Sequence, residues 1–292
     1  MKVLITGGSG FIGRGLSSYL KSKGHEVRWV SRKPAPGDCG WGPESLLEGV
    51  SWADGVVNLA GHLVLGIWTA SKRRRILDSR VKSTRLLVQA ILQAKSKSKV
   101  LVSGSAIGFY GDGGDRALDE SSPAAGAGDF LSEVCQAWEA EAMKAGQAGV
   151  RTCLIRTGHV LHPSGGVLKA MLLPFKLGLG GPMGNGRQWT SWIHLEDWCG
   201  LCLHLLLTPS LEGPFNAVGP EPLTNRDYSK QIAKTLGKPC IFTVPSFLLR
   251  MLGQVSQLFL DSQKILPKRA LDTGFSFKFP SLPDALQDLL AS

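Results

Sequence analysis

A glycine-rich segment near the start of the chain has the spacing of a phosphate-binding turn. Gly7, Gly10 and Gly13 follow the apolar run Lys2–Thr6, and together they read G-x-x-G-x-x-G. In such a turn the first glycine permits a tight bend, the second lets backbone N–H groups approach a pyrophosphate, and the third allows a helix to pack closely on a strand. Because the triplet lies between an expected strand and an expected helix, it predicts a dinucleotide site rather than a surface turn.

Cations follow the second expected strand, Glu26–Ser31, at the position where dinucleotide sites distinguish NAD from NADP. An NAD site usually has an Asp or Glu there, which accepts a hydrogen bond from the ribose 2′-hydroxyl. This chain has Arg32 and Lys33 instead. A guanidinium pairs well with a 2′-phosphate, so the sequence favours NADP(H) over NAD(H). The alternative is that both residues are ordinary surface cations.

The third expected strand, Gly55–Ala60, ends in the small-residue segment Asn-Leu-Ala-Gly. We expect Leu59 and Ala60 to run beside the adenine-side ribose of a dinucleotide. Arg80 stands next to the apolar residue Val81 of the following helix, from where its head group could reach a phosphate. We expect a solvated helix face for three neighbouring cations, which are Arg73, Arg74 and Arg75.

The pattern of apolar residues indicates which elements hold these motifs in place. Short apolar runs alternate with longer segments of helical period through the first half of the chain, which is typical of βαβ units and a parallel sheet. Apolar residues at steps of three and four predict crossover helices over Ser71–Lys95 and Asp129–Gly146. The predicted strands are Lys2–Thr6, Glu26–Ser31, Gly55–Ala60, Lys99–Ser103 and Arg151–Arg156.

After Arg156 the alternation of short apolar runs and helical segments ends. A glycine-rich segment over Gly178–Gly186 predicts a loop, and helical stretches are expected near Asn225–Leu236 and Ser246–Leu260. We therefore predict an α/β fold, a Rossmann-type doubly wound parallel sheet with a small C-terminal α/β substrate lobe. The expected division is an NADP-binding domain of residues 1–160, to which 191–218 return, and a substrate lobe of residues 161–190 and 219–292.

The composition excludes several classes of protein. The 292 residues include 36 glycines, and 43% are hydrophobic. This is enough for a full core and excludes a disordered chain, and the lack of a Gly-X-Y period excludes collagen. The 33 Lys and Arg residues exceed the 23 Asp and Glu residues by 10, but these cations are scattered and accompany no nucleic-acid-binding motif. The longest apolar stretch, Trp198–Leu207, is too short to span a membrane.

Six cysteines and a start without a secretory leader favour a reducing compartment, cytoplasmic or otherwise intracellular. Cys199 and Cys202 have the spacing of a redox pair, but they lie in an apolar run of helical appearance. We expect them to be buried apolar residues rather than a redox motif. No residues are assigned to a metal site.

These motifs resemble those of the extended short-chain dehydrogenases/reductases. More narrowly, they resemble atypical NAD-dependent epimerase/dehydratase-like proteins that are also described as cell-division-inhibitor-like. The resemblance covers essentially the whole chain and includes Ser103–Gly111, Trp138-Glu139, Arg156–Gly158, Leu172–Pro182, Trp192–Asp197 and Gly274-Phe275. It implies cofactor contacts at Gly7, Gly10, Phe11, Ile12, Gly13, Ser31, Arg32, Leu59, Ala60, Arg80 and Val160.

The resemblance also implies a catalytic arrangement that this chain matches only in part. In that superfamily a Tyr acts as general acid/base, a Lys four residues later lowers its pKa and holds the nicotinamide ribose, and a Ser or Thr orients the substrate oxygen. Ser105 fits the serine position. Counting back from Glu139, which resembles the acid that follows the usual Lys, the Lys position falls on Cys135 and the Tyr position on Leu131.

The missing pair leaves three interpretations: another residue substitutes, the reaction differs, or the site binds NADP(H) without turnover. Tyr110 is the nearest substitute, five residues past Ser105, although similar sequences have a Tyr-Gly pair here as part of a loop. His194 and Asp197 have the spacing of a helix start and are candidates for a substrate role, although Asp197 could instead be a local cap.

We therefore predict an NADP(H)-binding short-chain dehydrogenase/reductase-like protein, an oxidoreductase or epimerase that acts on an unidentified small molecule. The alternative is a non-catalytic NADP(H)-binding regulator or interaction protein, because the Tyr-x-x-x-Lys pair is absent. No nucleic acid or membrane partner is expected. The resemblance leaves a homodimer open, since dimers are common among similar proteins.

Overall fold

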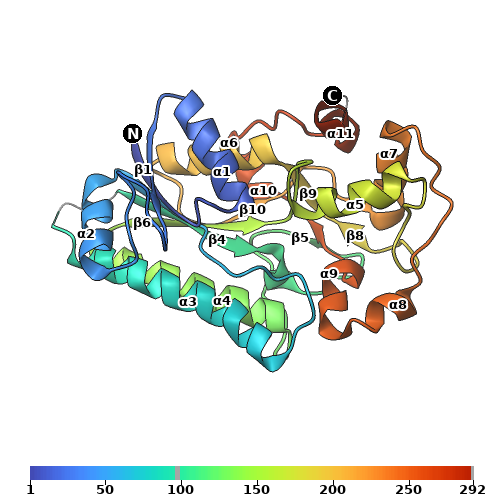
Figure 1. The fold of residues 1–292 in the computed structure, drawn as a ribbon, viewed down its shortest axis with the longest axis horizontal. Coiled ribbons are helices and arrows are strands. Elements are labelled where there is room, and N and C mark those ends of the chain that lie inside the picture. The colour runs from blue at the N-terminus through green and yellow to red at the C-terminus, as the bar shows by residue number, and fades with distance from the viewer. Residues whose placement is uncertain (96–98, 291–292) are drawn as a thin grey trace.

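A six-stranded parallel sheet forms the centre of the protein, which we describe from a computed structural model over residues 1–95 and 99–290. The strand order is β10-β6-β4-β3-β1-β2, and helices cover both faces (Figure 1). This arrangement confirms the predicted Rossmann-type doubly wound sheet. The strands are β1 (Lys2–Thr6), β2 (Glu26–Val30), β3 (Gly55–Asn58), β4 (Val100–Ala106), β6 (Arg151–Thr157) and β10 (Gly213–Ala217).

The five predicted strands are all present, with ends that differ by up to three residues. Central strands of a parallel sheet are buried on both faces, and β3 and β4 accordingly read as nearly continuous apolar or small-residue runs. The sixth strand, β10, has the sequence Gly-Pro-Phe-Asn-Ala and was not predicted, because glycine and proline disfavour a strand. It lies at the edge of the sheet, where Phe215 pairs with Ile155 of β6.

Two layers of helices pack on the sheet, as Figure 1 shows. On one face Leu16 and Leu20 share a buried core with Trp198, and on the other Leu46 and Ile91 share a second core. Both predicted crossover helices are confirmed. The first face is covered by α1 (Phe11–Ser22) and α6 (Leu195–Leu207), and the second by α2 (Pro43–Trp52), α3 (Ala70–Gln93) and α4 (Phe130–Met143).

The C-terminal part of the chain packs around a separate apolar core beyond the ends of the strands. Leu168, Trp192, Tyr228 and Leu286 are buried together in it. The helical stretch predicted over 246–260 is broken, because Gly253 has a φ of +71° that an α-helix cannot contain. The elements here are β7 (His159–Leu161), α5 (Gly166–Lys176), β8 (Trp189–Thr190), β9 (Trp192–His194), β11 (Leu223–Thr224), α7 (Asn225–Thr235), α8 (Ser246–Arg250), η3 (Gly253–Ser256), α9 (Gln257–Leu260), β12 (Lys264–Ile265), α10 (Lys268–Asp272) and α11 (Leu282–Leu290).

Short segments complete the connections: η1 (Ile107–Tyr110), β5 (Ala117–Leu118) and η2 (Lys144–Ala148). Cys199 and Cys202 of α6 are buried in the apolar core against the sheet. All six cysteines are free thiols. Within the described ranges, no helix is long and apolar enough to cross a membrane.

The order of the strands creates a crevice beside β1. The neighbours of β1 are β2 on one side and β3 on the other, so the connections that leave β1 and β3 run in opposite directions. Ligands of open α/β sheets bind at such a reversal, at the carboxyl ends of the strands. The predicted glycine turn follows β1 at this point.

The turn between β1 and α1 is too crowded for side chains at two of its three predicted glycines. Gly7 has a φ of +71°, and a Cβ on it would lie 2.6 Å from the carbonyl oxygen of Leu59. A Cβ on Gly13 would lie 2.4 Å from the carbonyl oxygen of Gly7. Gly10 has a φ of −70° and is the N-cap of α1 without a side-chain hydrogen bond. The first-turn N–H groups of α1 are therefore not capped by a side chain, which suits an anion.

We expect Gly13→Ala to lower the free energy of unfolding by about 1–3 kcal/mol, because the added methyl group overlaps backbone atoms of the same turn. Gly10→Ala is the matched control. A Cβ on Gly10 would lie 3.1 Å from the nearest atom, the carbonyl oxygen of Gly7, and the φ of Gly10 suits alanine. Urea denaturation followed by tryptophan fluorescence measures both. Equal stability of the two variants would contradict the close packing at Gly13.

Candidate active site and dinucleotide groove

Hydrogen bonds between buried polar side chains tie the ends of β1, β3 and β4 together. Thr6 Oγ1 donates to Asn58 Oδ1 at 2.7 Å and accepts from the backbone N–H groups of Leu59 and Ala60 at 3.2 Å each. Asn58 Nδ2 donates to Oγ1 of Thr84 and to Oγ of Ser103. The segment predicted to run beside a ribose is thus held against the glycine turn by a network with no charged member.

Cations gather at the edge of the sheet next to this segment. Arg32 and Lys33 are exposed directly after β2. Burial lowers the pKa of the His62 imidazole. The positive charges of four residues lower this pKa further, and these are Lys72, Arg75, Arg80 and Arg32. Three cations of α3 and Arg32 after β2 therefore lie close enough to His62 to disfavour its protonated form. Lys72 and Arg75 were missed as members of this group, although their spacing of three residues puts them on one face of α3.

Arg80 lies inside the cleft rather than in solvent. Its guanidinium donates to the carbonyl oxygens of His62 at 3.0 Å and Ile76 at 3.1 Å, and it stacks 5.2 Å from the centre of the Trp138 ring. Burial lowers its pKa. Among residues 1–95 and 99–290, no carboxylate forms an ion pair with it. An unpaired guanidinium in a half-buried position is suited to an anionic or polar ligand group.

A buried ion pair organises the polar groups behind the cleft. Glu139 accepts two hydrogen bonds of 2.9 Å from Arg156, and only 5% of the Arg156 side chain is exposed. Ser105 Oγ donates to the same carboxylate at 2.6 Å. Arg156 also donates to the Tyr110 hydroxyl at 2.9 Å, which in turn donates to Asn216 Oδ1 at 2.8 Å. The chain of contacts runs from β4 through α4 and β6 to η1 and β10.

Both hydroxyls that the sequence suggested for catalysis form hydrogen bonds within this network. Tyr110 is 4% exposed, and burial raises its pKa to about 12. Its hydroxyl has a donor and an acceptor in the protein, so it has no free proton for a substrate. Ser105 is also 4% exposed, and its hydroxyl hydrogen is directed at Glu139. Both residues therefore position the sheet and α4 relative to each other.

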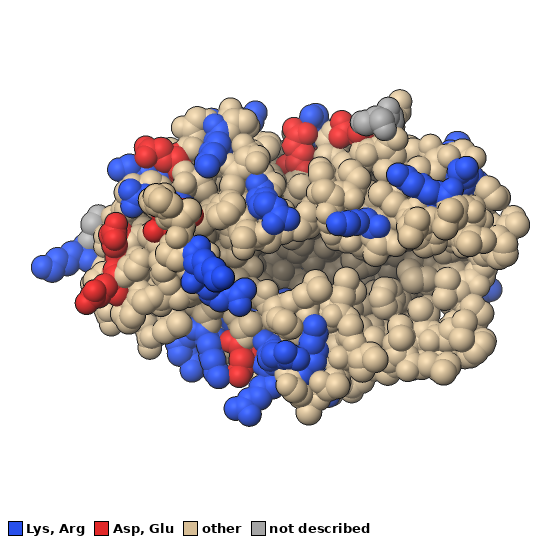
Figure 2. Space-filling model, viewed as in Figure 1, with Lys and Arg blue, Asp and Glu red and all other residues tan. Residues whose placement is uncertain are grey.

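A cavity of about 170 Å³ lies beside this network. Its wall includes Leu131 and Cys135, the two positions where the resemblance places Tyr and Lys, and it also includes Arg80 and Trp138. Burial raises the pKa of the Cys135 thiol to about 11, and its Sγ donates to the carbonyl oxygen of Ala106. Figure 2 shows the surface hollowed between the region of α1 and α5 and that of α3 and α9, with Lys and Arg along the rim.

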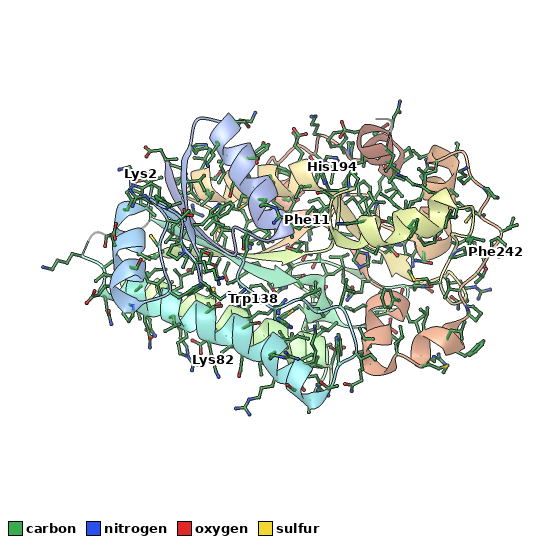
Figure 3. The ribbon with its side chains drawn as sticks, in the orientation of Figure 1. Lys2, Phe11, Lys82, Trp138, His194 and Phe242 are labelled. Atoms are coloured by element: carbon green, nitrogen blue, oxygen red, sulfur yellow. The ribbon has the colours of Figure 1, made fainter. Side chains whose placement is uncertain are left out.

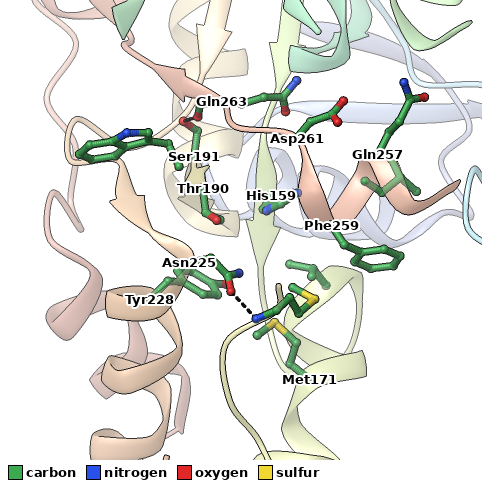
Figure 4. Close-up of a pocket in the computed structure, with 14 residues that line it drawn as sticks. His159, Met171, Thr190, Ser191, Asn225, Tyr228, Gln257, Phe259, Asp261 and Gln263 are labelled. Carbon is green, nitrogen blue, oxygen red and sulfur yellow. Dashed lines mark hydrogen bonds between the residues drawn. The ribbon is translucent and has the colours of Figure 1, made fainter. Parts of the chain in front are cut away.

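Residues from the C-terminal part of the chain close the cavity on its other side. His159 on β7 and Asp261, which follows α9, line both this cavity and a smaller adjoining one of about 30 Å³ (Figure 4). Burial lowers the pKa of the His159 imidazole to about 4, so it is neutral at physiological pH. Burial, with Asp112 and Asp129 adding to it, raises the pKa of Asp261 to about 7. Sequence reasoning missed both residues, because neither belongs to a spaced motif.

His194 and Asp197, predicted as substrate contacts, do not line these cavities. His194 (labelled in Figure 3) is the N-cap of α6. Its Nε2 lies 3.3 Å from Asp288 of α11. Asp197 accepts the backbone N–H groups of Lys278 and Phe279 at 2.7 and 3.0 Å. Both residues fasten the C-terminal segment to α6. Of the remaining predicted cofactor residues, Phe11 and Ile12 begin α1 directly after the turn, and Val160 of β7 lies in the apolar core against which both pack.

The residues around the turn fit a dinucleotide. The backbone there leaves no room for side chains at Gly7 and Gly13, no side chain caps the N-terminus of α1, and four cations lie near His62 in the adjoining segment. No group of three or more His, Cys, Asp or Glu residues suited to a metal ion occurs in the part of the chain that the structure describes.

Known proteins match this chain along its whole length. The model of the NAD dependent epimerase/dehydratase family matches residues 3–219, and a domain of unknown function, DUF1731, matches residues 244–289. The mouse epimerase family protein SDR39U1 is 37% identical, with both chains fully covered. The crystal structure of human epimerase family protein SDR39U1 (isoform 2) with NADPH superposes with a TM-score of 0.93, 36% identity and full coverage of both chains.

A second crystal structure, of the nucleoside-diphosphate sugar epimerase from Corynebacterium glutamicum, superposes with a TM-score of 0.83 at 33% identity. The match covers 99% of this chain and 58% of that one.

We expect Arg156→Leu to lower the free energy of unfolding by about 3–5 kcal/mol, because it leaves the buried Glu139 carboxylate without its partner. Lys82→Leu is a control that breaks the exposed pair with Asp78, and it should leave stability unchanged. Urea denaturation with circular dichroism detection compares the two. A small effect of Arg156→Leu would contradict the central place of this ion pair.

Proposed function

The chain belongs to the NAD-dependent epimerase/dehydratase family, and we propose that it binds NADP(H) and acts as an oxidoreductase on a small carbonyl compound. The single observation that carries the proposal is the glycine turn beside a cationic edge, in a chain that resembles a protein crystallised with NADPH at a TM-score of 0.93.

The turn and its neighbours supply each contact that the cofactor needs. The uncapped first turn of α1, with Gly10, Phe11 and Ile12, would bind the pyrophosphate through backbone N–H groups. Leu59 and Ala60 would lie beside the adenine ribose. Arg32, with Ser31 and the neighbouring cations, would bind the 2′-phosphate. Arg80 would bind polar groups of the cofactor at its nicotinamide end.

When bound, NADPH supplies a hydride to an electrophilic carbon. The cavity beside Leu131 and Cys135 is the place where a substrate would meet the nicotinamide, because it adjoins the ends of β4 and β6 and is enclosed by apolar side chains. Enclosure excludes bulk water and favours transfer to the substrate over loss of the hydride. We propose that residues 161–190 and 219–292 form the lobe that closes over the substrate.

A second function has one specific observation in its favour. Leu131 and Cys135 cannot exchange a proton as Tyr and Lys do, so NADP(H) binding without turnover, in a regulator, would explain their presence. Persistent NADPH binding with no oxidation by any carbonyl compound would favour this alternative.

We expect Arg32→Asp to weaken NADPH binding by roughly 10- to 100-fold, because a charge-assisted pair with the 2′-phosphate is replaced by repulsion. NADH binding should be retained or improved, since Asp can accept a hydrogen bond from the 2′-hydroxyl. Fluorescence titration with both cofactors measures the two affinities.

The matched control for this substitution is Arg74→Asp, which makes the same charge change at a side chain that is 82% exposed on α3. It should leave the ratio of NADPH to NADH affinity unchanged. If Arg32→Asp retains the wild-type preference for NADPH, the assignment of Arg32 is wrong.

A further inference from the structure

The cavity of about 170 Å³, where we place the substrate, has one carboxyl group in its wall, that of Asp261. The Asp261 side chain has no hydrogen bond or ion pair with any described residue, whereas its backbone N–H donates to the carbonyl oxygen of Gln257. Asp261 is half-buried. Withdrawing a carboxylate from water without a partner is unfavourable, so the neutral acid is stabilised at this position. A neutral carboxylic acid is itself a hydrogen-bond donor, and here its donor faces a cavity.

The other proton-bearing groups at this end of the sheet are committed elsewhere. Ser105 donates to Glu139, Tyr110 donates to Asn216, and the Cys135 thiol donates to the carbonyl oxygen of Ala106. His159 is neutral at physiological pH, so its remaining ring proton is not acidic. Asp261 is therefore the group on the cavity wall with both an uncommitted proton and the acidity to release it.

We propose that Asp261 is the general acid of the reduction, the residue that protonates the carbonyl oxygen of an aldehyde or ketone. This inference rests on the proposed oxidoreductase function. The carbonyl carbon gains a C–H bond with the hydride of NADPH while the C=O π bond breaks, and the oxygen takes the proton of Asp261. The products are an alcohol, NADP⁺ and the Asp261 carboxylate, so atoms and electrons balance. The apolar body of the substrate would pack on Leu131, Val134 and Leu258.

The groups around Asp261 keep its proton in place until it is used. Asp112, which follows η1, and Asp129, the N-cap of α4, both disfavour its ionised form. His159 on β7 lines the same cavities as a neutral ring, and Gln257 and Gln263 are near Asp261 in sequence (Figure 4). The one cation of the shared cavity, Arg80 on α3, forms no ion pair with it in the described structure.

The smaller cavity behind Asp261 offers a route for reprotonation. It has a volume of about 30 Å³, which is enough for a water molecule, and it is lined by Thr190, Ser191 and Asn225 as well as by Asp261 and His159. Tyr228, which is 1% exposed, also lines this cavity, and its hydroxyl has no hydrogen-bond partner among the described residues. Such a buried hydroxyl indicates a water site, and water there would return a proton to the carboxylate after each turnover.

The test compares the wild-type protein with Asp261→Asn in the full-length chain. Turnover is followed by nicotinamide absorbance, with NADPH and two probes, 4-nitrobenzaldehyde and 9,10-phenanthrenequinone. We expect Asp261→Asn to lower kcat by roughly 10²- to 10⁴-fold, the usual contribution of a general acid, with NADPH affinity unchanged by fluorescence titration. In the wild type, kcat should fall as pH rises above about 7, because Asp261 then loses its proton, and this dependence should disappear in the variant.

A spectroscopic measurement makes the placement of Asp261 independent of turnover. Carboxyl ¹³C NMR of the NADP⁺-bound protein, labelled at aspartate, should show one group titrating near 7 that is missing from Asp261→Asn. Asp261→Glu should recover part of the rate, and Asp272→Asn, at an exposed aspartate of α10, should match the wild type in every measurement.

Separate outcomes overturn the two proposals. Turnover of Asp261→Asn at the wild-type rate, or an Asp261 carboxyl that titrates in the usual aspartate range, would reject the general acid and leave the oxidoreductase function standing. Tight NADPH binding with neither probe reduced by the wild type would reject the oxidoreductase function, and the general acid with it. Failure of the wild type to bind NADPH would reject the cofactor site.

Discussion

The Arg156–Glu139 ion pair is the interaction on which the remainder of the site depends. It is buried between β6 and α4, and it reaches β4 through Ser105, η1 through Tyr110 and β10 through Asn216. A buried charge pair is tolerated only when every remaining hydrogen-bonding position is filled. The network therefore uses the hydroxyls that lie nearest the strand ends, and the chemistry of the cleft has to come from other side chains.

The features of this protein that could be predicted from its sequence are those encoded by residues close together in the chain. The glycine turn, the parallel strands and the crossover helices are local patterns, so the fold class and the position of the glycine turn could be predicted from spacing. Arg80 was singled out for the same reason, because it stands beside an apolar stripe, and its cofactor contact remains a prediction. By contrast, β10 was missed, since its Gly-Pro-Phe-Asn-Ala sequence is unfavourable for a strand and only pairing with β6 makes it one.

His159 and Asp261 show where the limit lies. They are about a hundred positions apart, and neither has neighbours whose types and spacing signal chemistry. Their relevance comes from sharing a cavity wall, and from burial that shifts their pKa values in opposite directions. The residue types of Tyr110 and His194 suit catalysis, but the Tyr110 hydroxyl has hydrogen-bond partners inside the protein and His194 Nδ1 accepts the backbone N–H of Glu196. Tertiary contacts, which no single sequence reveals, decided all four cases.

The late position of β10 in the chain has a consequence for folding. Residues 158–212, with α5, β8, β9 and α6, separate β10 from its partner β6. Pairing of strands so distant in sequence carries a loop-closure entropy and slows folding. Asn216 of β10 accepts the hydrogen bond of Tyr110, so the polar network closes only once this strand docks. Until then the Tyr110 hydroxyl lacks its acceptor, and the edge of β6 is open to pairing with another chain. The edge that completes the polar network is thus also the one on which a folding intermediate is most exposed to aggregation.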